Sequence, residues 1–120
     1  MKERTLCSSD YRLLTLVWDH APLGSGELVR LCQEELGWKK STTYTEIKRL
    51  CEKGFLKNEK AVVEPLVTRE EIQARESDLF VERTFGGSLP GFLTAFLGGK
   101  KLSVREAEEL KRLIDEYREE

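Results

Sequence analysis

A row of hydroxyl and basic side chains marks the segment from Lys39 to Leu50, which reads KKSTTYTEIKRL. Ser and Thr are mediocre helix formers, yet Ile47 and Leu50 have the spacing of a helix that is buried on one side. We expect a helix from about Ser41 to Lys53. The residues expected on its outer face are Ser41, Thr42, Thr45, Glu46 and Arg49, with Lys48 beside them.

Such a face suits the reading of DNA in the major groove. Short hydroxyl side chains let a helix approach base edges closely, where they bond to either base and touch the thymine methyl group. Arg49 and Lys48 can reach phosphates, and Lys39 and Lys40 stand at the helix N-terminus, whose free amides also attract an anion. The alternative is a Thr-rich first turn that bonds to its own backbone, with lysines that are merely solvated.

Two short helices are expected before this segment. Apolar residues with helical spacing place the first from about Ser9 to Asp19, and the run from His20 to Gly24 ends it. The second helix can be capped by Ser25 and ends at Gly37. The third helix is the one expected from about Ser41 to Lys53. The residues expected to point from it to the core are Thr43, Ile47, Leu50 and Cys51.

The hydrophobic period changes after Gly54. Residues 55–59 and 62–67 read as two short strands joined by a turn near Lys60. Pro65 cannot donate to a β-ladder, so we expect its strand to be an edge strand or to be interrupted there. Three short helices followed by a hairpin is the order of a winged helix-turn-helix domain. We therefore predict a mostly α fold with a small β-hairpin, a DNA-binding domain over residues 1–68, and Lys60 as a DNA contact at the wing tip.

Residues 69–120 are expected to form a three-helix dimerisation region. The first of its helices ends near Phe85, and Ser103-x-x-Glu106 is a capping box that opens the last one. These helices are too short and too apolar to stand alone, so we expect them to pack on a second copy, the alternative being the first domain. The predicted interface residues are Leu79, Phe80, Leu89, Phe92, Leu93, Phe96, Leu97, Leu110 and Ile114.

Composition and charge restrict the class of protein. Of 120 residues, 39% are apolar and 35% charged, which is typical of a folded, soluble protein. No apolar run approaches the ~20 residues of a membrane span, and the N-terminus has no secretion signal, so we expect a cytoplasmic protein. Residues 38–60 carry seven Lys and Arg against three Glu, a net charge of +4, whereas the rest of the chain carries −6. A basic island favours a local phosphate-binding face, although a solvated Lys-rich helix would look the same.

The chain shows no motif for catalysis, a cofactor or a metal. Cys7, Cys32 and Cys51 form no C-x-x-C pair, and the single His20 stands at a helix end, where it favours the helix dipole. We therefore expect no enzyme, no cofactor, no metal and no small-molecule site. Two functions remain: a DNA-binding protein, or a winged-helix protein-interaction module that does not bind DNA. Glu46 on the outer face supports the second, because it would repel phosphate.

Ten residues along the first part of the chain have a distinctive spacing: Trp18, His20, Glu27, Trp38, Thr42, Thr45, Arg49, Leu50, Lys53 and Gly54. This combination resembles the penicillinase and methicillin-resistance repressor family. The tail segments FGGSL at 85–89 and LTAFL at 93–97 are also similar to that family's dimerisation region. The resemblance covers about Leu6 to Glu116 and implies a homodimeric winged-helix repressor of palindromic operator DNA, bound as two half-sites.

The resemblance also implies a mode of release and exposes differences. Members paired with a membrane-bound sensor protease are inactivated by cleavage in the dimerisation region, between an Asn and a Phe; the matching pair here is Ala95–Phe96. The wing tip of the best-known members resembles a Gly-Arg turn, whereas this chain has Lys60-Ala61-Val62-Val63. The segment between Thr68 and Phe85 is a few residues shorter. The C-terminal cysteine cluster of the related copper-responsive repressors is absent, which argues against copper sensing.

Overall fold

The computed structural model describes residues 5–119 and divides into two compact units, one ending at Glu76 and the other beginning at Ser77. The boundary falls inside helix α4 (Arg69–Phe85), which contributes to both units. The functional division after residue 68 stays a prediction. Across residues 5–119, no helix is both long and apolar enough to cross a lipid bilayer.

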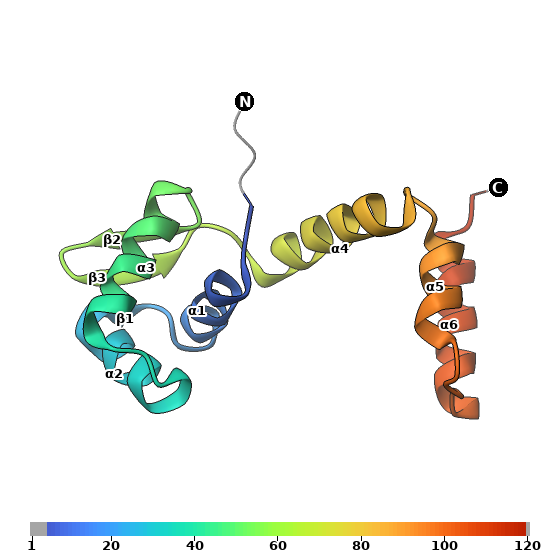
Figure 1. The fold of residues 1–120 in the computed structure, drawn as a ribbon, viewed down its shortest axis with the longest axis horizontal. Helices are drawn as coiled ribbons and strands as arrows, with labels where there is room; N and C mark the ends of the chain where they lie inside the picture. Colours follow the sequence, from blue (N-terminus) through green and yellow to red (C-terminus); the bar gives the residue numbers. More distant parts are fainter. Residues whose placement is uncertain (1–4, 120) are drawn as a thin grey trace. The chain divides into compact units, whose positions relative to one another are not determined.

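Three short helices open the first unit (Figure 1): α1 (Ser8–His20), α2 (Ser25–Leu36) and α3 (Lys40–Glu52). Each lies within a residue or two of its expected bounds. Helix α1 starts where the Cys7 amide donates to the Asp10 carboxylate over 2.9 Å, which satisfies one of the unpaired amides of the first turn. Helix α2 ends where Gly37 takes a left-handed conformation with φ of 69°, which glycine adopts without steric cost.

A small antiparallel sheet of three strands in the order β1-β3-β2 completes this unit: β1 (Leu23–Gly24), β2 (Leu56–Glu59) and β3 (Val62–Pro65). The sequence prediction missed β1, whose two residues are too few for a recognisable period. Its pairing makes β3 the central strand, so the expectation of an edge strand was wrong. The expected interruption at Pro65 is confirmed, because β3 ends there and β1 pairs only with Val62 and Val63.

The turn between β2 and β3 is tight although it contains no glycine. Lys60 and Ala61 both have positive φ, 52° and 61°. Two consecutive residues with positive φ match the right-handed twist of a hairpin, but residues other than Gly, Asn and Asp rarely supply them. The Ala61 carbonyl also accepts a 2.8 Å hydrogen bond from the Ser25 amide, which ties the turn to the start of α2.

The core of the first unit lies between the three helices and the sheet, and it includes the first turns of α4 through Ile72, which is 2% exposed. Thr43 is fully buried, as its spacing predicted, and its hydroxyl donates to the Lys39 carbonyl. The other large fully buried side chains include Leu13, Leu14, Leu28, Ile47, Leu50, Phe55, Leu56 and Val63. This packing fixes which face of α3 remains in solvent.

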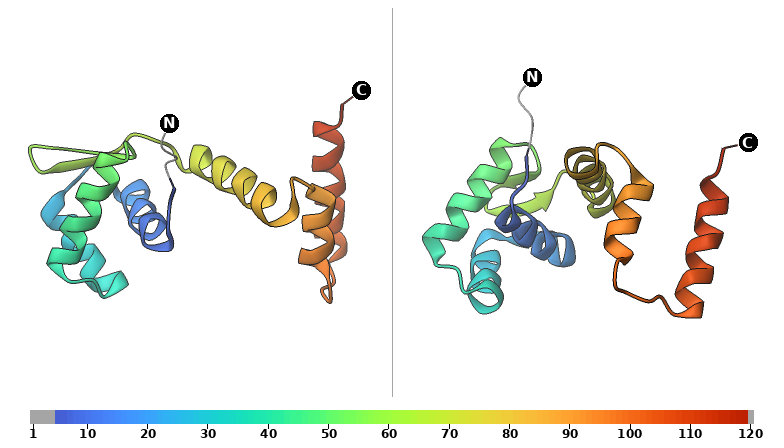
Figure 2. Two further views of the ribbon diagram at one scale, coloured as in Figure 1. Left: turned by 45° about the horizontal axis from the view of Figure 1, so that its top comes forward. Right: turned by 45° about the vertical axis from the view of Figure 1, so that its right-hand side comes forward.

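The second unit contains the end of α4 together with α5 (Leu89–Leu97) and α6 (Val104–Tyr117). Figure 2 shows α5 and α6 running in opposite directions, joined by a short loop. The predicted cap of α6 is confirmed, because Ser103 Oγ accepts from the Glu106 amide over 3.1 Å. Phe80, Phe85, Phe92 and Phe96 form a chain of ring contacts with centroids 5.6–5.9 Å apart. Neither α5 nor α6 contains a fully buried residue, so their apolar faces stay at least partly exposed in the single chain.

Candidate nucleic-acid interface

Helix α3 presents a polar, partly basic face to solvent. Ser41, Thr42, Thr45 and Lys48 are exposed, as predicted, and so are Lys39 and Lys40 at the helix N-terminus. Tyr44 is exposed as well, at 39%, and sequence reasoning left it unassigned. Its spacing of three from Ser41 and four from Lys48 was the signal that could have found it. The exposed face therefore combines short hydroxyls, one phenol and lysines.

The hydroxyls on this face are partly used by the helix itself. Thr45 Oγ1 donates to the Ser41 carbonyl over 2.9 Å, which is the self-bonding that the alternative interpretation expected. The hydroxyl proton of Thr45 is thereby occupied, but its oxygen can still accept a hydrogen bond and its methyl group remains free to contact thymine. Thr45 is thus equipped as an acceptor and an apolar contact.

The prediction that Glu46 lies on the outer face was wrong, because its side chain is buried with 7% of the residue exposed. Glu46 stands three residues after Thr43 and four before Leu50, both fully buried, so it falls on the same stripe of the helix. The carboxylate is turned toward the start of α1. It therefore does not oppose an approaching phosphate from the exposed face, and the argument that it favours an interaction module is lost.

Arg49 lies at the centre of an ion-pair cluster between α3 and α1. One of its terminal nitrogens, Nη2, lies 3.0 Å from Asp10 Oδ2 and 3.0 Å from Cys7 Sγ, while Nη1 lies 3.4 Å from Glu46 Oε1. Lys53 Nζ adds a contact of 3.2 Å to the same Asp10 oxygen. The Asp10 side chain is fully buried, whereas 42% of the Arg49 side chain is exposed. Arg49 is therefore positioned between the protein interior and solvent.

The environment shifts the pKa values of the two carboxyl groups of this cluster in opposite directions. Burial works against ionisation of Asp10, but hydrogen bonds from the Cys7 amide, from Glu46 and from Lys53 outweigh it and lower the pKa of Asp10 to about 2. Burial is also the largest influence on Glu46, followed by the hydrogen bond to Asp10 and its charge, and together they raise the pKa of Glu46. One carboxylate is held ionised while its neighbour is driven toward the protonated form.

The hairpin beyond α3 carries charges of both signs. Lys60 is exposed at its tip, as the prediction requires. Lys57 Nζ lies 3.8 Å from Glu59 and 3.8 Å from Glu64, so part of the positive charge is offset locally. The basic character of this unit is therefore concentrated on α3 and its flanks more than on the wing.

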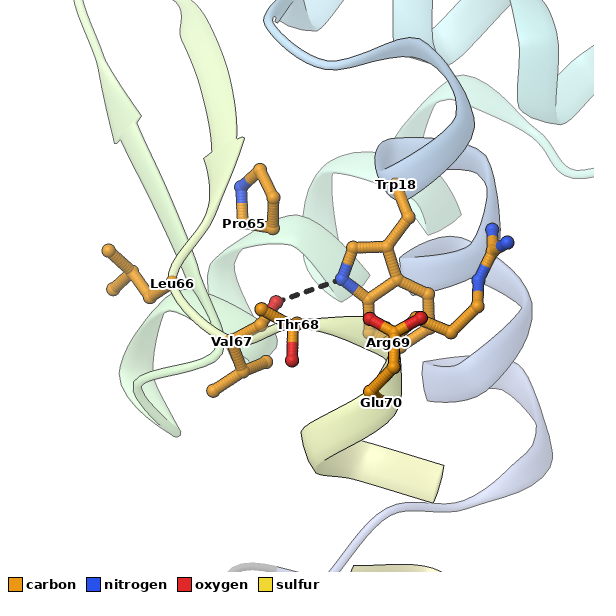
Figure 3. Close-up of a pocket in the computed structure, with 7 residues that line it drawn as sticks. All are labelled: Trp18, Pro65, Leu66, Val67, Thr68, Arg69 and Glu70. Atoms are coloured by element: carbon orange, nitrogen blue, oxygen red, sulfur yellow. Dashed lines mark hydrogen bonds between the residues drawn. The ribbon is translucent and has the colours of Figure 1, made fainter. Parts of the chain in front are cut away.

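A shallow pocket lies beside Trp18 at the start of α4 (Figure 3). The Trp18 indole nitrogen donates to the Val67 carbonyl over 2.9 Å, and the Arg69 guanidinium lies 5.5 Å from the indole ring. Arg69 is also paired with Asp19 at 2.6 Å. The main polar groups of the pocket thus bond within the protein and fix the path of the chain into α4. No group of three His, Cys, Asp or Glu among residues 5–119 could hold a metal ion.

The residues predicted for dimerisation lie in the second unit or on α4. Leu79, Phe92, Leu93, Leu97 and Leu110 are partly buried, while Phe80, Leu89, Phe96 and Ile114 are exposed. Ala95 and Phe96, the candidate cleavage pair, are both exposed but sit inside the last turn of α5, where the Ala95 carbonyl accepts from the Gly98 amide. The structure brings most of these apolar residues into one region without burying them.

The chain is similar to proteins of known family. A family model described as penicillinase repressor matches residues 6–116. The penicillinase repressor of Bacillus licheniformis is 23% identical over 117 residues, 94% of this chain and 91% of that protein. The methicillin resistance regulatory protein MecI of Staphylococcus aureus strain N315 is 23% identical and covers 95% of this chain and 96% of its own. An uncharacterised 16.5 kDa protein of Latilactobacillus sakei is 32% identical, covering 95% and 82%.

The solution structure of the DNA binding domain of the repressor BlaI resembles the fold of the first unit. It aligns with a TM-score of 0.53 and 21% identity, covering 59% of this chain and 93% of that domain. The predicted winged-helix architecture, mostly helical with a small antiparallel sheet, is confirmed.

Proposed function

The chain belongs to the penicillinase repressor family, and from this premise we propose that it is a DNA-binding transcriptional repressor that reads its site with α3. The observation that carries the proposal is the exposed face of α3, where short hydroxyls and lysines project from a helix that is packed on α1 and α2. A helix held this way can enter a major groove with its N-terminal turns against the base edges.

The roles of the exposed residues follow from their chemistry. Ser41, Thr42 and Thr45 are short enough to reach base edges, and Tyr44 extends the same face. Lys39, Lys40 and Lys48 flank these residues and bind phosphates, which fixes the position of the helix on the duplex without reading sequence. Lys60 adds a phosphate contact from the wing. Base contacts and phosphate contacts are thus divided between two sets of residues.

The second unit supports a homodimer. Many of the exposed large apolar side chains belong to this unit, including Leu113 at 48% and Ile114 at 57% on α6. Large contiguous apolar surfaces are rare on monomers. A second copy related by a two-fold axis would cover these side chains. Two copies of α3 would then bind two half-sites of a palindromic operator, which multiplies the effective concentration of each reading helix. The dimer would act in the cytoplasm, together with its DNA.

Release of the repressor by proteolysis is the matching proposal for regulation. The Ala95–Phe96 bond lies on an exposed stretch of α5, and cleavage there would separate α6 from the rest of the dimerisation region. Because the bond lies in a helical turn, the last turn of α5 must unwind to enter a protease. A membrane-bound sensor protease is the partner that the family resemblance implies.

The test is a footprint on the DNA upstream of the protein's own gene, followed by affinity measurements between 50 and 200 mM salt. A repressor that makes ~6 phosphate contacts loses several orders of magnitude in affinity over this range. Protection of a two-fold symmetric site with this salt dependence supports the proposal. A winged-helix interaction module would give no specific protection at any salt concentration, and that result would overturn it.

A further inference from the structure

Two buried carboxylates meet where α3 packs on α1. Asp10 is fully buried and Glu46 is 7% exposed. The Cys7 amide, Arg49 and Lys53 all donate to the same Asp10 oxygen, Oδ2. The remaining oxygens, Asp10 Oδ1 and Glu46 Oε2, are buried and accept no hydrogen bond from any third residue in the described part of the chain. The hydrogen bond that joins the two carboxyl groups requires a proton on one of them. This is the arrangement of two carboxyl groups that share one proton.

The charges that face Glu46 come from both packed helices. Asp10 and the Cys7 thiol approach from the α1 side. Arg49 belongs to α3, and Lys53 is the residue that directly follows α3. With both carboxylates ionised, two anions face two cations. With a proton on Glu46 the cluster gains one net positive charge, and Arg49 keeps one anionic partner in place of two. Asp10 is still held by the Cys7 amide and by Lys53.

We propose, on the basis of the DNA-binding function above, that Glu46 is a positioning residue for Arg49 and that its proton decides where the Arg49 guanidinium binds. When Glu46 is ionised, Arg49 bridges the two carboxylates. When a proton from solvent occupies Glu46 Oε2 and points to Asp10 Oδ1, Arg49 is released from one anchor and turns to a DNA phosphate. Its side chain is already 42% exposed, so no core residue has to move.

The environment of Glu46 supports this coupling, and the coupling has a measurable consequence. Burial together with Asp10 raises the pKa of Glu46, so Glu46 keeps its proton to a higher pH in the folded protein than in the unfolded chain. The coupling is also reciprocal: if protonation of Glu46 favours phosphate binding, then DNA binding must draw a proton onto Glu46. The cluster therefore makes DNA affinity dependent on pH through a residue that never touches DNA.

The experiment measures binding of the full chain to a fluorescein-labelled duplex of random sequence, because a phosphate contact needs no operator. Affinity is recorded from about pH 5 to about pH 8 at constant salt. For the wild type we expect affinity to fall on the order of fivefold or more per protomer as pH rises, the low end of typical couplings between sites. Glu46→Gln keeps the shape of the side chain and removes the titration, so it should bind with nearly constant, high affinity. Arg49→Ala should bind weakly and also lose the pH dependence.

Glu52→Gln is the matched control, since Glu52 is exposed on the same helix and the change in charge is identical. It should retain the pH profile of the wild type. Equal profiles for the wild type and Glu46→Gln would overturn the inference, as would a pH dependence that survives in Arg49→Ala. Absence of DNA binding by the wild type at every pH would instead overturn the proposed function.

A second measurement covers the case in which Glu46→Gln fails to fold. Calorimetric titration of the wild type with the same duplex, in two buffers of different ionisation enthalpy, gives the number of protons taken up on binding. For a fivefold coupling we expect uptake that rises to a maximum of about 0.4 proton per protomer, and more if the coupling is stronger. No uptake across the range would overturn the inference.

Discussion

The guanidinium of Arg49 on α3 lies 3.0 Å from Oδ2 of Asp10, a fully buried carboxylate in the first turn of α1. The two residues stand 39 positions apart in the chain. The same carboxylate oxygen accepts a hydrogen bond from the Cys7 amide at the start of α1, so one atom both caps α1 and anchors α3 against it. If α3 reads DNA as proposed, stability and DNA binding are linked at this position.

Replacement of Asp10 by Asn should destabilise the first unit. The variant keeps the shape of the side chain but loses charge-assisted bonds to Arg49 and Lys53, so we expect a loss of about 2 kcal/mol in the free energy of unfolding. Urea unfolding followed by circular dichroism at neutral pH measures it. Asp78→Asn, an exposed change of the same kind on α4, is the control and should stay close to the wild type.

Asp10 should also determine how the free energy of unfolding changes at low pH. The pKa of Asp10 is lowered to about 2 in the folded protein, below its ordinary value, so the folded state holds fewer protons than the unfolded state between pH ~4 and ~2. Its contribution to stability is therefore complete above pH ~4 and is lost as pH falls to ~2. The stability difference between wild type and Asp10→Asn should shrink over this window. A difference that is constant with pH would contradict the assignment.

Ionisation of Glu46 should have the opposite effect on the pH dependence of stability. Its pKa is raised on folding, so the folded state binds more protons and stability falls as pH rises through the folded pKa. Glu46→Gln should remove this fall and should therefore gain stability relative to the wild type at the alkaline end. The measurement is the urea midpoint of both proteins from about pH 4 to about pH 8. Parallel midpoints throughout would show that Glu46 titrates as it does in the unfolded chain.

Thr42 and Thr45 should carry sequence discrimination, whereas Thr43 should carry stability. Thr42→Ala or Thr45→Ala removes an exposed polar contact, and we expect a loss of ~1–3 kcal/mol in the preference for operator over random DNA for each lost base contact. Thr43→Ala removes a buried hydroxyl that bonds to the Lys39 carbonyl, and should lower the unfolding midpoint with little change in preference. Competition binding with operator and random duplexes separates the two effects. Unchanged preference in both exposed variants would mean that α3 is not the reading helix.

A glycine at position 61 in the β2–β3 turn should stabilise the protein. Ala61 has a φ of 61°, and the left-handed conformation costs a residue with a Cβ roughly 1–2 kcal/mol. Because glycine loses more backbone entropy on folding, Ala61→Gly should gain about 0.5–1 kcal/mol in the free energy of unfolding. Ala74→Gly on the exposed side of α4 is the control, and should lose about 1 kcal/mol as glycine does in helices. A loss of stability in both variants would show that the turn is not strained.

The dimer should fail when a charge is placed on α6. Ile114 is 57% exposed in the single chain, and in a symmetric dimer Ile114→Glu would bury the charge twice, weakening association on the order of 100-fold or more. Arg112→Gln changes the net charge by the same amount on the opposite face of α6 and should leave association intact. Sedimentation velocity over a range of concentrations measures both. Equal sedimentation of the two variants would exclude α6 from the interface.

A truncation that isolates the first unit has to respect the packing of α4. The predicted DNA-binding domain ends at residue 68, and a chain cut after Val67 would leave out Ile72, which is 2% exposed within the core of the first unit. A chain ending at Glu76 keeps that residue and should fold as a monomer with poor operator affinity. The shorter chain should be less stable by about 2–5 kcal/mol, the usual cost of removing a large buried aliphatic side chain.

The sequence by itself determined the elements of this protein. Apolar spacing placed the helices, Gly37 and Gly54 ended two of them, and Ser103 with Glu106 marked the last cap, because each of these signals acts within a few residues of the chain. The same spacing correctly separated Thr43 from the exposed hydroxyls beside it. The family resemblance rested on these local patterns as well.

Only the tertiary structure decided which polar residues of α3 face solvent and what they contact. Glu46 belongs to the buried stripe because α1 brings Asp10 and its hydrogen-bond donors against that side of the helix, and β1 exists only because β3 lies beside it. A charged residue is normally placed on the outer face of a helix, since burial of an isolated carboxylate is too costly. Partners that remove this cost come from residues about 40 positions away, and no pattern within a helix can reveal them.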